Sequence, residues 1–237
     1  MKKRRFFALF LVLGLLVSLL SVPASAFEEI DVDARAALLV EKETGEILYE
    51  KNAHEKNYPA SITKLTVALL VFEAIDAGQL SLDQPITAHE SAFEGLSIYG
   101  GTAGIKVGEV LTVEQLLQCM LIVSANEACN VVAEYIAGDI PSFVALMNAQ
   151  AAALGMTGTH FANAHGLHDE NHYTTVRDLV TLARWAWQSE QFQEFSTQTS
   201  HTVPATNKSE ERVLHTTNYL TSGQTVGKYY YDKARGI

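Results

Sequence analysis

The sequence predicts a mixed α/β fold of the α+β kind, with helices in the middle of the chain and strands toward both ends. Two observations lead to this class. Apolar segments of helical length, bounded by capping residues, recur between residues 59 and 188. Short segments rich in strand-forming residues lie near residues 36–50 and 200–217.

The first 26 residues have the three parts of a signal peptide. Basic residues at 2–5 precede an apolar run at 6–20, and Ala24-Ser25-Ala26 provides a small-residue cleavage site. The apolar run is shorter than the roughly 20 residues that a membrane-spanning helix needs. We therefore expect a secreted protein with one domain, residues 27–237; an uncleaved membrane anchor is the alternative.

The elements of this domain follow from local signals. Residues 36–40 and 46–50 flank Thr44-Gly45 and predict a β-hairpin. Helices are expected over 59–78, 113–121, 127–137, 142–154 and 174–188. The Gly-rich stretch 84–108 predicts turns and short strands, and residues 158–173 a loop. Strands are expected at 200–203 and 213–217 around a turn at 207–210.

The composition excludes two classes of partner. The chain carries 17 Lys+Arg against 27 Asp+Glu, and four of the basic residues belong to the signal peptide. So acidic a domain is a poor ligand for the phosphate backbone of nucleic acid. It also lacks the basic amphipathic helix of a membrane-surface protein. Cys119 and Cys129 are about 15 Å apart on a continuous helix, so a disulfide requires a break near Ser124.

Ser61 and Lys64 form the first chemical motif. A helix opening at Pro59 places Ser61 in its first turn and Lys64 one turn later on the same face. The helix dipole favours negative charge at such a hydroxyl, and a nearby amine accepts its proton. Apolar neighbours such as Leu65 are expected to lower the lysine pKa, as a general base requires. Alone, this spacing also occurs as an ordinary exposed Ser and Lys.

Ser124 and Asn126 form the second motif, at the junction of two predicted helices. In a turn, both side chains can face one cleft. There Ser124 can relay a proton to a leaving amine, and Asn126 can bind a substrate amide with its donor and its acceptor. The structural alternative is a Ser/Asn helix cap.

These segments together resemble the penicillin-recognising serine enzymes, and most closely the low-molecular-weight D-alanyl-D-alanine carboxypeptidases of serine peptidase family S11. The resemblance rests on Tyr58–Leu65, Ser124–Ala128, Asn163–Leu167 and His172–Thr175 and covers nearly the whole predicted domain. It implies the β-lactamase/transpeptidase-like fold, with an antiparallel sheet and a helical subdomain.

The resemblance also implies a role for each motif residue. Ser61 attacks the penultimate D-alanine of a peptidoglycan stem peptide, and Lys64 takes its proton. Ser124 completes the proton relay, Asn126 positions the substrate, and the backbone N–H of Ser61 forms one arm of the oxyanion hole. It further implies acylation by β-lactam antibiotics, action outside the cytoplasm, and no metal or cofactor.

One family motif is absent. Lys-Thr-Gly is expected directly after Arg235-Gly236-Ile237, so we expect the catalytic domain to be incomplete here, with its C-terminal strands missing. A C-terminal membrane anchor is left open. One alternative function is a β-lactamase of the same fold, for which the loop offers only Asp169 and Glu170 as a water-holding carboxylate. The other is a non-catalytic peptidoglycan-binding or regulatory protein.

Two residue clusters favour structural roles. The histidines of the 158–173 loop have no standard zinc-ligand spacing. The aromatic residues that follow are expected to pack in the core or at its rim, not to form a sugar-binding platform. The residues concerned are His160, His165, His168 and His172, and Trp185, Trp187, Phe192 and Phe195.

Overall fold

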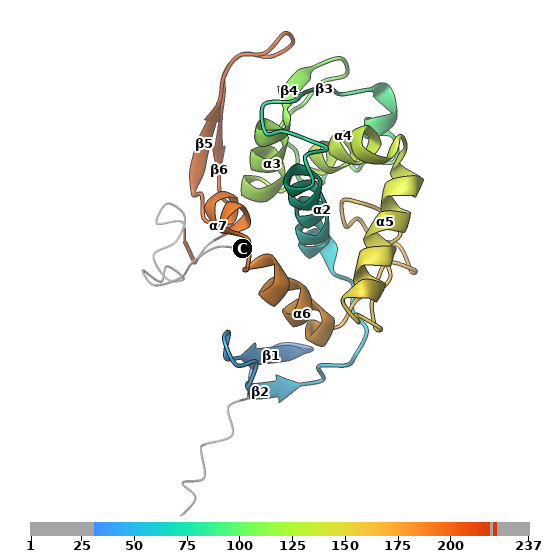
Figure 1. Ribbon diagram of the computed structural model, residues 1–237, viewed down its shortest axis with the longest axis vertical. Coiled ribbons are helices and arrows are strands. Elements are labelled where there is room, and N and C mark those ends of the chain that lie inside the picture. The colour runs from blue at the N-terminus through green and yellow to red at the C-terminus, as the bar shows by residue number, and fades with distance from the viewer. Residues whose placement is uncertain (1–30, 219, 222–237) are drawn as a thin grey trace, which may run out of the picture. The chain divides into compact units, whose positions relative to one another are not determined.

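The computed structural model describes residues 31–218 and 220–221 (Figure 1). Two compact units are distinguished, residues 1–34 and 35–237. In the first, only residues 31–34 are described, and they form neither helix nor strand. Every element below belongs to the second unit. The expected signal peptide and the C-terminal Gly236-Ile237 lie outside the described residues.

Helix α2, Lys64–Asp76, is the centre of the second unit (Figure 1). It is buried on almost every side, as its continuous apolar sequence requires, because it has no polar face to present to water. Every other helix named here packs against it. These are α3 (Val113–Ile122), α4 (Asn126–Ala137), α5 (Ile140–Ala153), α6 (Val176–Ala186) and α7 (Glu190–Ser196).

Among the α-helices of the described residues, α7 was not predicted from the sequence. Its seven residues are mostly polar and too short for a clear helical period. Phe192 and Phe195 hold it in place, because both rings pack edge-on against Phe72 of α2, with centroids 6.4 and 5.6 Å apart. Both phenylalanines are buried, and Trp185 and Trp187 lie partly buried against the same core. The predicted packing role of these aromatic residues is confirmed.

The described strands form three separate two-stranded antiparallel sheets. Both predicted hairpins are present: β1 (Ala37–Val40) pairs with β2 (Ile47–Lys51), and β5 (Ser200–Val203) with β6 (Arg212–His215). The third pair joins β3 (Pro85–Thr87) to β4 (Val110–Thr112) across the Gly-rich stretch, which also contains the short 3-10 helix η2 (Glu90–Phe93).

Capping residues explain most helix ends. Thr112 and Gln115 form a capping box at the start of α3, with both reciprocal hydrogen bonds present. Gly138 ends α4 in the left-handed conformation, with φ of 85°. Helix α5 begins at Ile140, two residues earlier than predicted, because Asp139 accepts from the backbone N–H of Ser142 at 2.6 Å.

The chain does break between α3 and α4, yet Cys119 and Cys129 are free, buried thiols. Burial raises the pKa of both to about 12, so neither is a reactive thiolate near neutral pH. Within residues 31–218, no helix is both long enough and apolar enough to cross a bilayer.

Candidate active site

Ser61 lies in the 3-10 helix η1, Ala60–Thr63, which leads into α2. The sequence analysis placed it in the first turn of the α-helix itself, and that detail is wrong. Ala60 has a positive φ of 49°, so the regular α-helix begins only at Lys64. Ser61 remains exposed, whereas Lys64 is 3 % exposed. The nucleophile candidate therefore faces solvent and its base candidate lies beneath it.

The Lys64 amine has three hydrogen-bond partners. Its Nζ lies 3.3 Å from Ser61 Oγ, 2.8 Å from Asn126 Oδ1 and 2.7 Å from the carbonyl oxygen of His165. The ammonium form has three N–H donors, one for each partner. A neutral amine keeps two N–H groups. Asn126 Oδ1 and the His165 carbonyl oxygen can only accept hydrogen bonds, so they take these two N–H groups. The lone pair is then left for the Ser61 hydroxyl, which is the arrangement of a proton acceptor.

The environment of Lys64 favours this neutral form. Burial lowers its pKa from 10.5, and the influence of Cys129 and Glu127 offsets this only in part. The predicted direction of the shift is therefore confirmed. A lysine whose pKa lies closer to neutrality is a more effective general base.

Ser124 and Asn126 occupy the short connection between α3 and α4. Asn126 is the first residue of α4, and its side-chain oxygen binds Lys64 directly. The Ser124 hydroxyl is buried and has no hydrogen-bond partner within the described part of the chain. An unpaired buried hydroxyl is unusual in a folded protein, and it keeps one donor and its acceptor lone pairs unused.

Backbone strain is concentrated at this site. Among the described residues, three non-glycine residues have positive φ, namely Asn52, Ala60 and Ser124. Ala60 directly precedes Ser61, and Ser124 belongs to the second motif. Such conformations cost about 1–3 kcal/mol each and cluster where function requires an unusual geometry. The sequence carries no signal for them, because neither alanine nor serine favours this conformation.

The loop 158–173 packs against η1 and contacts both of its ends. Gly166, with φ of 88°, packs so closely on Ala60 that a Cβ there would collide with the Ala60 carbonyl. His172 binds the other end of η1, with Nε2 2.7 Å from Thr63 Oγ1. Its Nδ1 accepts from the backbone N–H of Ala162, so Nε2 carries the proton and donates to Thr63. The resemblance covered this loop without giving His172 a role.

The ends of the loop are themselves anchored. Asp178 of α6 accepts from the backbone N–H of Gly158 at 2.8 Å and from the Thr159 hydroxyl at 2.7 Å. Asn57 and Thr174 form a β-bridge that ties the chain entering η1 to the loop's exit. The loop is therefore a fixed support for the Ser61 turn.

We expect His172 to make stability pH-dependent. Burial lowers its pKa from 6.5 to about 4, with a smaller opposing effect of Asp169. Between these values the unfolded chain binds more protons, so this contribution is present above about pH 6.5 and is lost as the pH falls toward 4. His172→Gln should flatten the urea-unfolding stability profile between pH 7 and 4, by at most about 1.4 kcal/mol per pH unit.

His165, whose pKa burial also lowers to about 4, remains in that variant. The slope should therefore fall without vanishing. An unchanged slope would contradict the prediction. His168→Gln is a suitable comparison, because the His168 ring packs edge-on against the exposed Tyr58, whereas His172 is buried and hydrogen-bonded to Thr63 of η1.

A cavity of about 340 Å³ lies beside Asn126. Its apolar wall comes from Phe93, Leu96, Ile98 and Ile105, and α4 contributes Asn126 and Glu127. Glu127 is 3 % exposed, and its carboxylate accepts from Thr102 Oγ1 and the backbone N–H of Ala103. The space next to the proposed amide-binding residue is thus open and largely apolar.

The histidines of the loop do not converge on one point. His160 Nδ1 lies 2.6 Å from the carbonyl oxygen of Asn171, while His165 Nδ1 accepts from the backbone N–H of Leu167. Within the described ranges, no three side chains of His, Cys, Asp or Glu are grouped so as to hold a metal ion.

Comparison with known proteins identifies the family of the chain. The sequence pattern of peptidase family S11, described as D-alanyl-D-alanine carboxypeptidase, matches residues 23–230. The chain is 34 % identical over 188 residues to D-alanyl-D-alanine carboxypeptidase DacF of Bacillus subtilis, covering 76 % of the chain and 48 % of DacF. It is 36 % identical over 156 residues to DacC of Escherichia coli, covering 65 % and 39 % respectively.

A solved structure agrees as well. The crystal structure of D-alanyl-D-alanine carboxypeptidase DacD from Francisella tularensis superposes with a TM-score of 0.72 at 34 % identity, covering 78 % of this chain and 44 % of that one. The chain thus spans half or less of the length of these relatives. With the family pattern matched over most of its residues, the chain belongs to the D-alanyl-D-alanine carboxypeptidase family, peptidase family S11.

Proposed function

We propose that the protein is a serine-type D-alanyl-D-alanine carboxypeptidase that removes the terminal D-alanine from peptidoglycan stem peptides. The observation that carries the proposal is the placement of the Lys64 amine between two obligate acceptors and the exposed Ser61 hydroxyl. Family membership supports the choice of substrate. The proposed chemistry needs no cofactor.

In the acylation step, Ser61 Oγ attacks the carbonyl carbon of the penultimate D-alanine while its proton passes to neutral Lys64. The new C–O bond forms, and the peptide C–N bond then breaks. The leaving amine of the terminal D-alanine takes a proton from the Ser124 hydroxyl, which in turn receives the proton held by Lys64, so that Lys64 is neutral again. Ser124 is suited to this relay because its hydroxyl is buried beside the site and, among the described residues, unpaired.

In the deacylation step, Lys64 accepts a proton from water as the water attacks the ester carbonyl. The C–O bond to Ser61 then breaks, the shortened stem peptide leaves, and Lys64 returns the proton to Ser61 Oγ. Asn126 uses Oδ1 for Lys64, so its Nδ2 is the group that donates to a substrate carbonyl. The backbone N–H of Ser61 supplies one donor to the oxyanion. Each motif residue thus has a separate task.

The proposed substrate places the reaction outside the cytoplasm, in agreement with the predicted signal peptide at residues 1–26. β-Lactam antibiotics are the expected acylating inhibitors, because their strained amide presents a carbonyl to Ser61 in the same way. The acidic domain argues against nucleic acid as a partner.

A labelling experiment tests the proposal. Fluorescent penicillin should attach to the full-length protein, with the added mass on the peptide that contains Ser61. A peptide ending in D-Ala-D-Ala should release free D-alanine. Rapid turnover of nitrocefin without a lasting adduct would replace the proposal with a β-lactamase. Absence of both labelling and D-alanine release would leave a non-catalytic peptidoglycan-binding role.

A further inference from the structure

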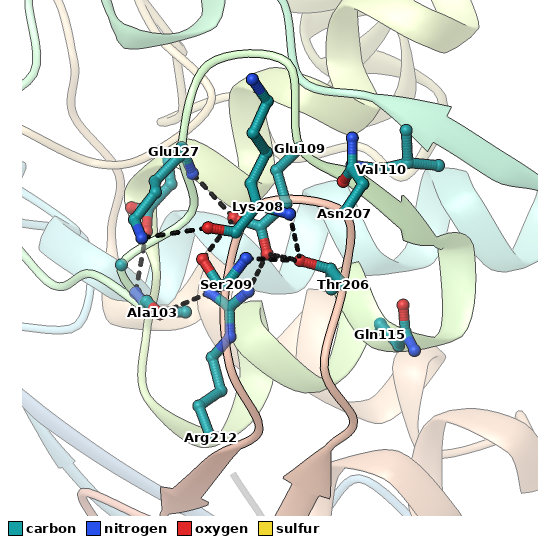
Figure 2. Close-up of polar contacts among 12 residues, drawn as sticks. Ala103, Glu109, Val110, Gln115, Glu127, Thr206, Asn207, Lys208, Ser209 and Arg212 are labelled. Carbon is teal, nitrogen blue, oxygen red and sulfur yellow. Dashed lines mark hydrogen bonds and ion pairs between the residues drawn. The ribbon is translucent and has the colours of Figure 1, made fainter.

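The tip of the β5–β6 hairpin is bound to a segment far away in the sequence (Figure 2). We call residues 206–212 the hairpin tip and residues 103–110 the anchored segment. The side-chain amide of Asn207 links the two through two hydrogen bonds of 2.9 Å each. It accepts from the backbone N–H of Val110 and donates to the carbonyl of Gly108. The tip is therefore held against the anchored segment along its length.

A buried ion pair lies at the centre of this contact. Glu109 is fully buried and accepts from the hydroxyls of Thr206 and Ser209, at 2.8 and 3.3 Å. Its carboxylate also pairs with Nη2 of Arg212, whose side chain is 14 % exposed. The other terminal nitrogen, Nη1, donates to the carbonyl of Ala103 at 2.9 Å. Arg212 thus binds two acceptors at once, as only a planar guanidinium does well.

The anchored segment leads directly to the candidate active site. The carbonyl of Ala103 accepts from Arg212, and the N–H of Ala103 donates to the Glu127 carboxylate at 2.8 Å. The Thr102 hydroxyl donates to the same carboxylate oxygen at 2.7 Å. Glu127 is the neighbour of Asn126 on α4. Asn126 in turn donates its backbone N–H to the carbonyl of Gly101 at 2.9 Å.

Residues 100 and 101, which precede the anchored segment, approach the site closely on the side that faces α4. A Cβ at Gly100 would collide with Nδ2 of Asn126, and one at Gly101 would collide with the carbonyl of Ser124. A displacement of residues 100–103 toward α4 therefore has to move Ser124 or Asn126, because close-packed groups transmit small shifts. A displacement away from α4 removes the hydrogen bond from the Asn126 N–H to the Gly101 carbonyl.

We propose that Arg212 is a positioning residue for the acyl-transfer site. Its guanidinium binds Glu109 and the Ala103 carbonyl together and so holds residues 100–103 against Asn126. This inference rests on the proposed function. Arg212 itself does not contact Ser61 or Lys64; it acts through the backbone that carries and supports Asn126.

Two altered proteins test the proposal. Arg212→Lys keeps the charge beside Glu109 but cannot reach both acceptors in the same way. The double variant Glu109→Gln/Arg212→Gln removes both charges and so avoids leaving one buried charge unpaired. Arg35→Gln is the matched control, because it breaks an exposed ion pair with Glu55 away from the site.

The rate of penicillin acylation per folded molecule is the first readout, with the folded fraction measured by circular dichroism. We expect about a 10-fold fall for both altered proteins and no change for Arg35→Gln, since a displacement of about 1 Å can lower a rate up to 10²-fold. Wild-type acylation rates in both altered proteins, with or without a lower melting temperature, would overturn the inference and show that the ion pair only stabilises the fold.

The pH profile of acylation is the second readout. Asn126 Oδ1 stabilises the Lys64 ammonium, so its displacement should lower the Lys64 pKa and move the acidic limb of the profile, which reports deprotonation of this base, to lower pH. Glu127 and Cys129 of α4 and His165 of the loop also face Lys64, and all three remain in the altered proteins. Failure of the wild-type protein to label at Ser61 would instead refute the proposed function, so the two failures are distinguishable.

Discussion

Replacing Lys64 with methionine is expected to lower the rate at which penicillin acylates Ser61 by roughly 10²- to 10⁴-fold, the range contributed by a general base. Methionine has a similar length and fits the apolar surroundings, but it has no lone pair on nitrogen to accept the Ser61 proton. A water molecule cannot readily take the place of the missing amine as base, because Lys64 is only 3 % exposed. The measurement is stopped-flow acylation with a fluorescent penicillin.

The same substitution should change how stability responds to pH. Burial lowers the pKa of Lys64 in the folded state below 10.5. Between the two pKa values the unfolded chain binds more protons, so the stability of the wild-type protein rises with pH across that window. Lys64→Met should lack this rise in urea-unfolding experiments that approach pH 10.5 from below.

Lys56→Met is the control for both measurements. Lys56 is exposed, and its ammonium lies 3.8 Å from the centre of the Tyr173 ring, with no contact to Ser61. This variant should acylate at the wild-type rate. If Lys64→Met also acylated at that rate, Lys64 would not be the base, and the mechanism proposed here would be wrong.

Gly166→Ala is expected to have the second-largest effect, and Gly155→Ala provides a matched comparison. Both glycines have positive φ, 88° and 72°, so alanine is strained by about 1–2 kcal/mol at either position. They differ in the space available. A Cβ at Gly155 meets nothing within 4 Å, whereas a Cβ at Gly166 collides with the Ala60 carbonyl.

The collision can be relieved only by moving the loop or the turn that carries Ser61. We therefore expect Gly166→Ala to lose a further ~1–3 kcal/mol of unfolding free energy and to acylate up to 10²-fold more slowly. Gly155→Ala should lose only the cost of backbone strain and acylate normally. Equal losses of stability and activity in the two variants would show that the close approach of Gly166 to Ala60 has no functional importance.

Much of the fold could be predicted because its signals are local. The capping box at Thr112 and the left-handed Gly138 act within a few residues of the helix ends that they define. The hairpin strands around Thr44-Gly45 are equally local. Helix α7 escaped prediction because it depends on Phe72, far earlier in the chain, rather than on its own short polar sequence.

By itself, the sequence determined the chemical identity of the candidate site: Ser61 and Lys64 one turn apart, and Ser124 and Asn126 at a helix junction. Only the tertiary structure decided that the Lys64 amine has its three partners, that Gly166 and His172 support the Ser61 turn, and that Arg212 reaches the segment beside Asn126. The physical reason is distance along the chain. Helical spacing and capping are set by neighbouring residues, whereas burial, a shifted pKa and a close backbone approach exist only once remote segments have packed together.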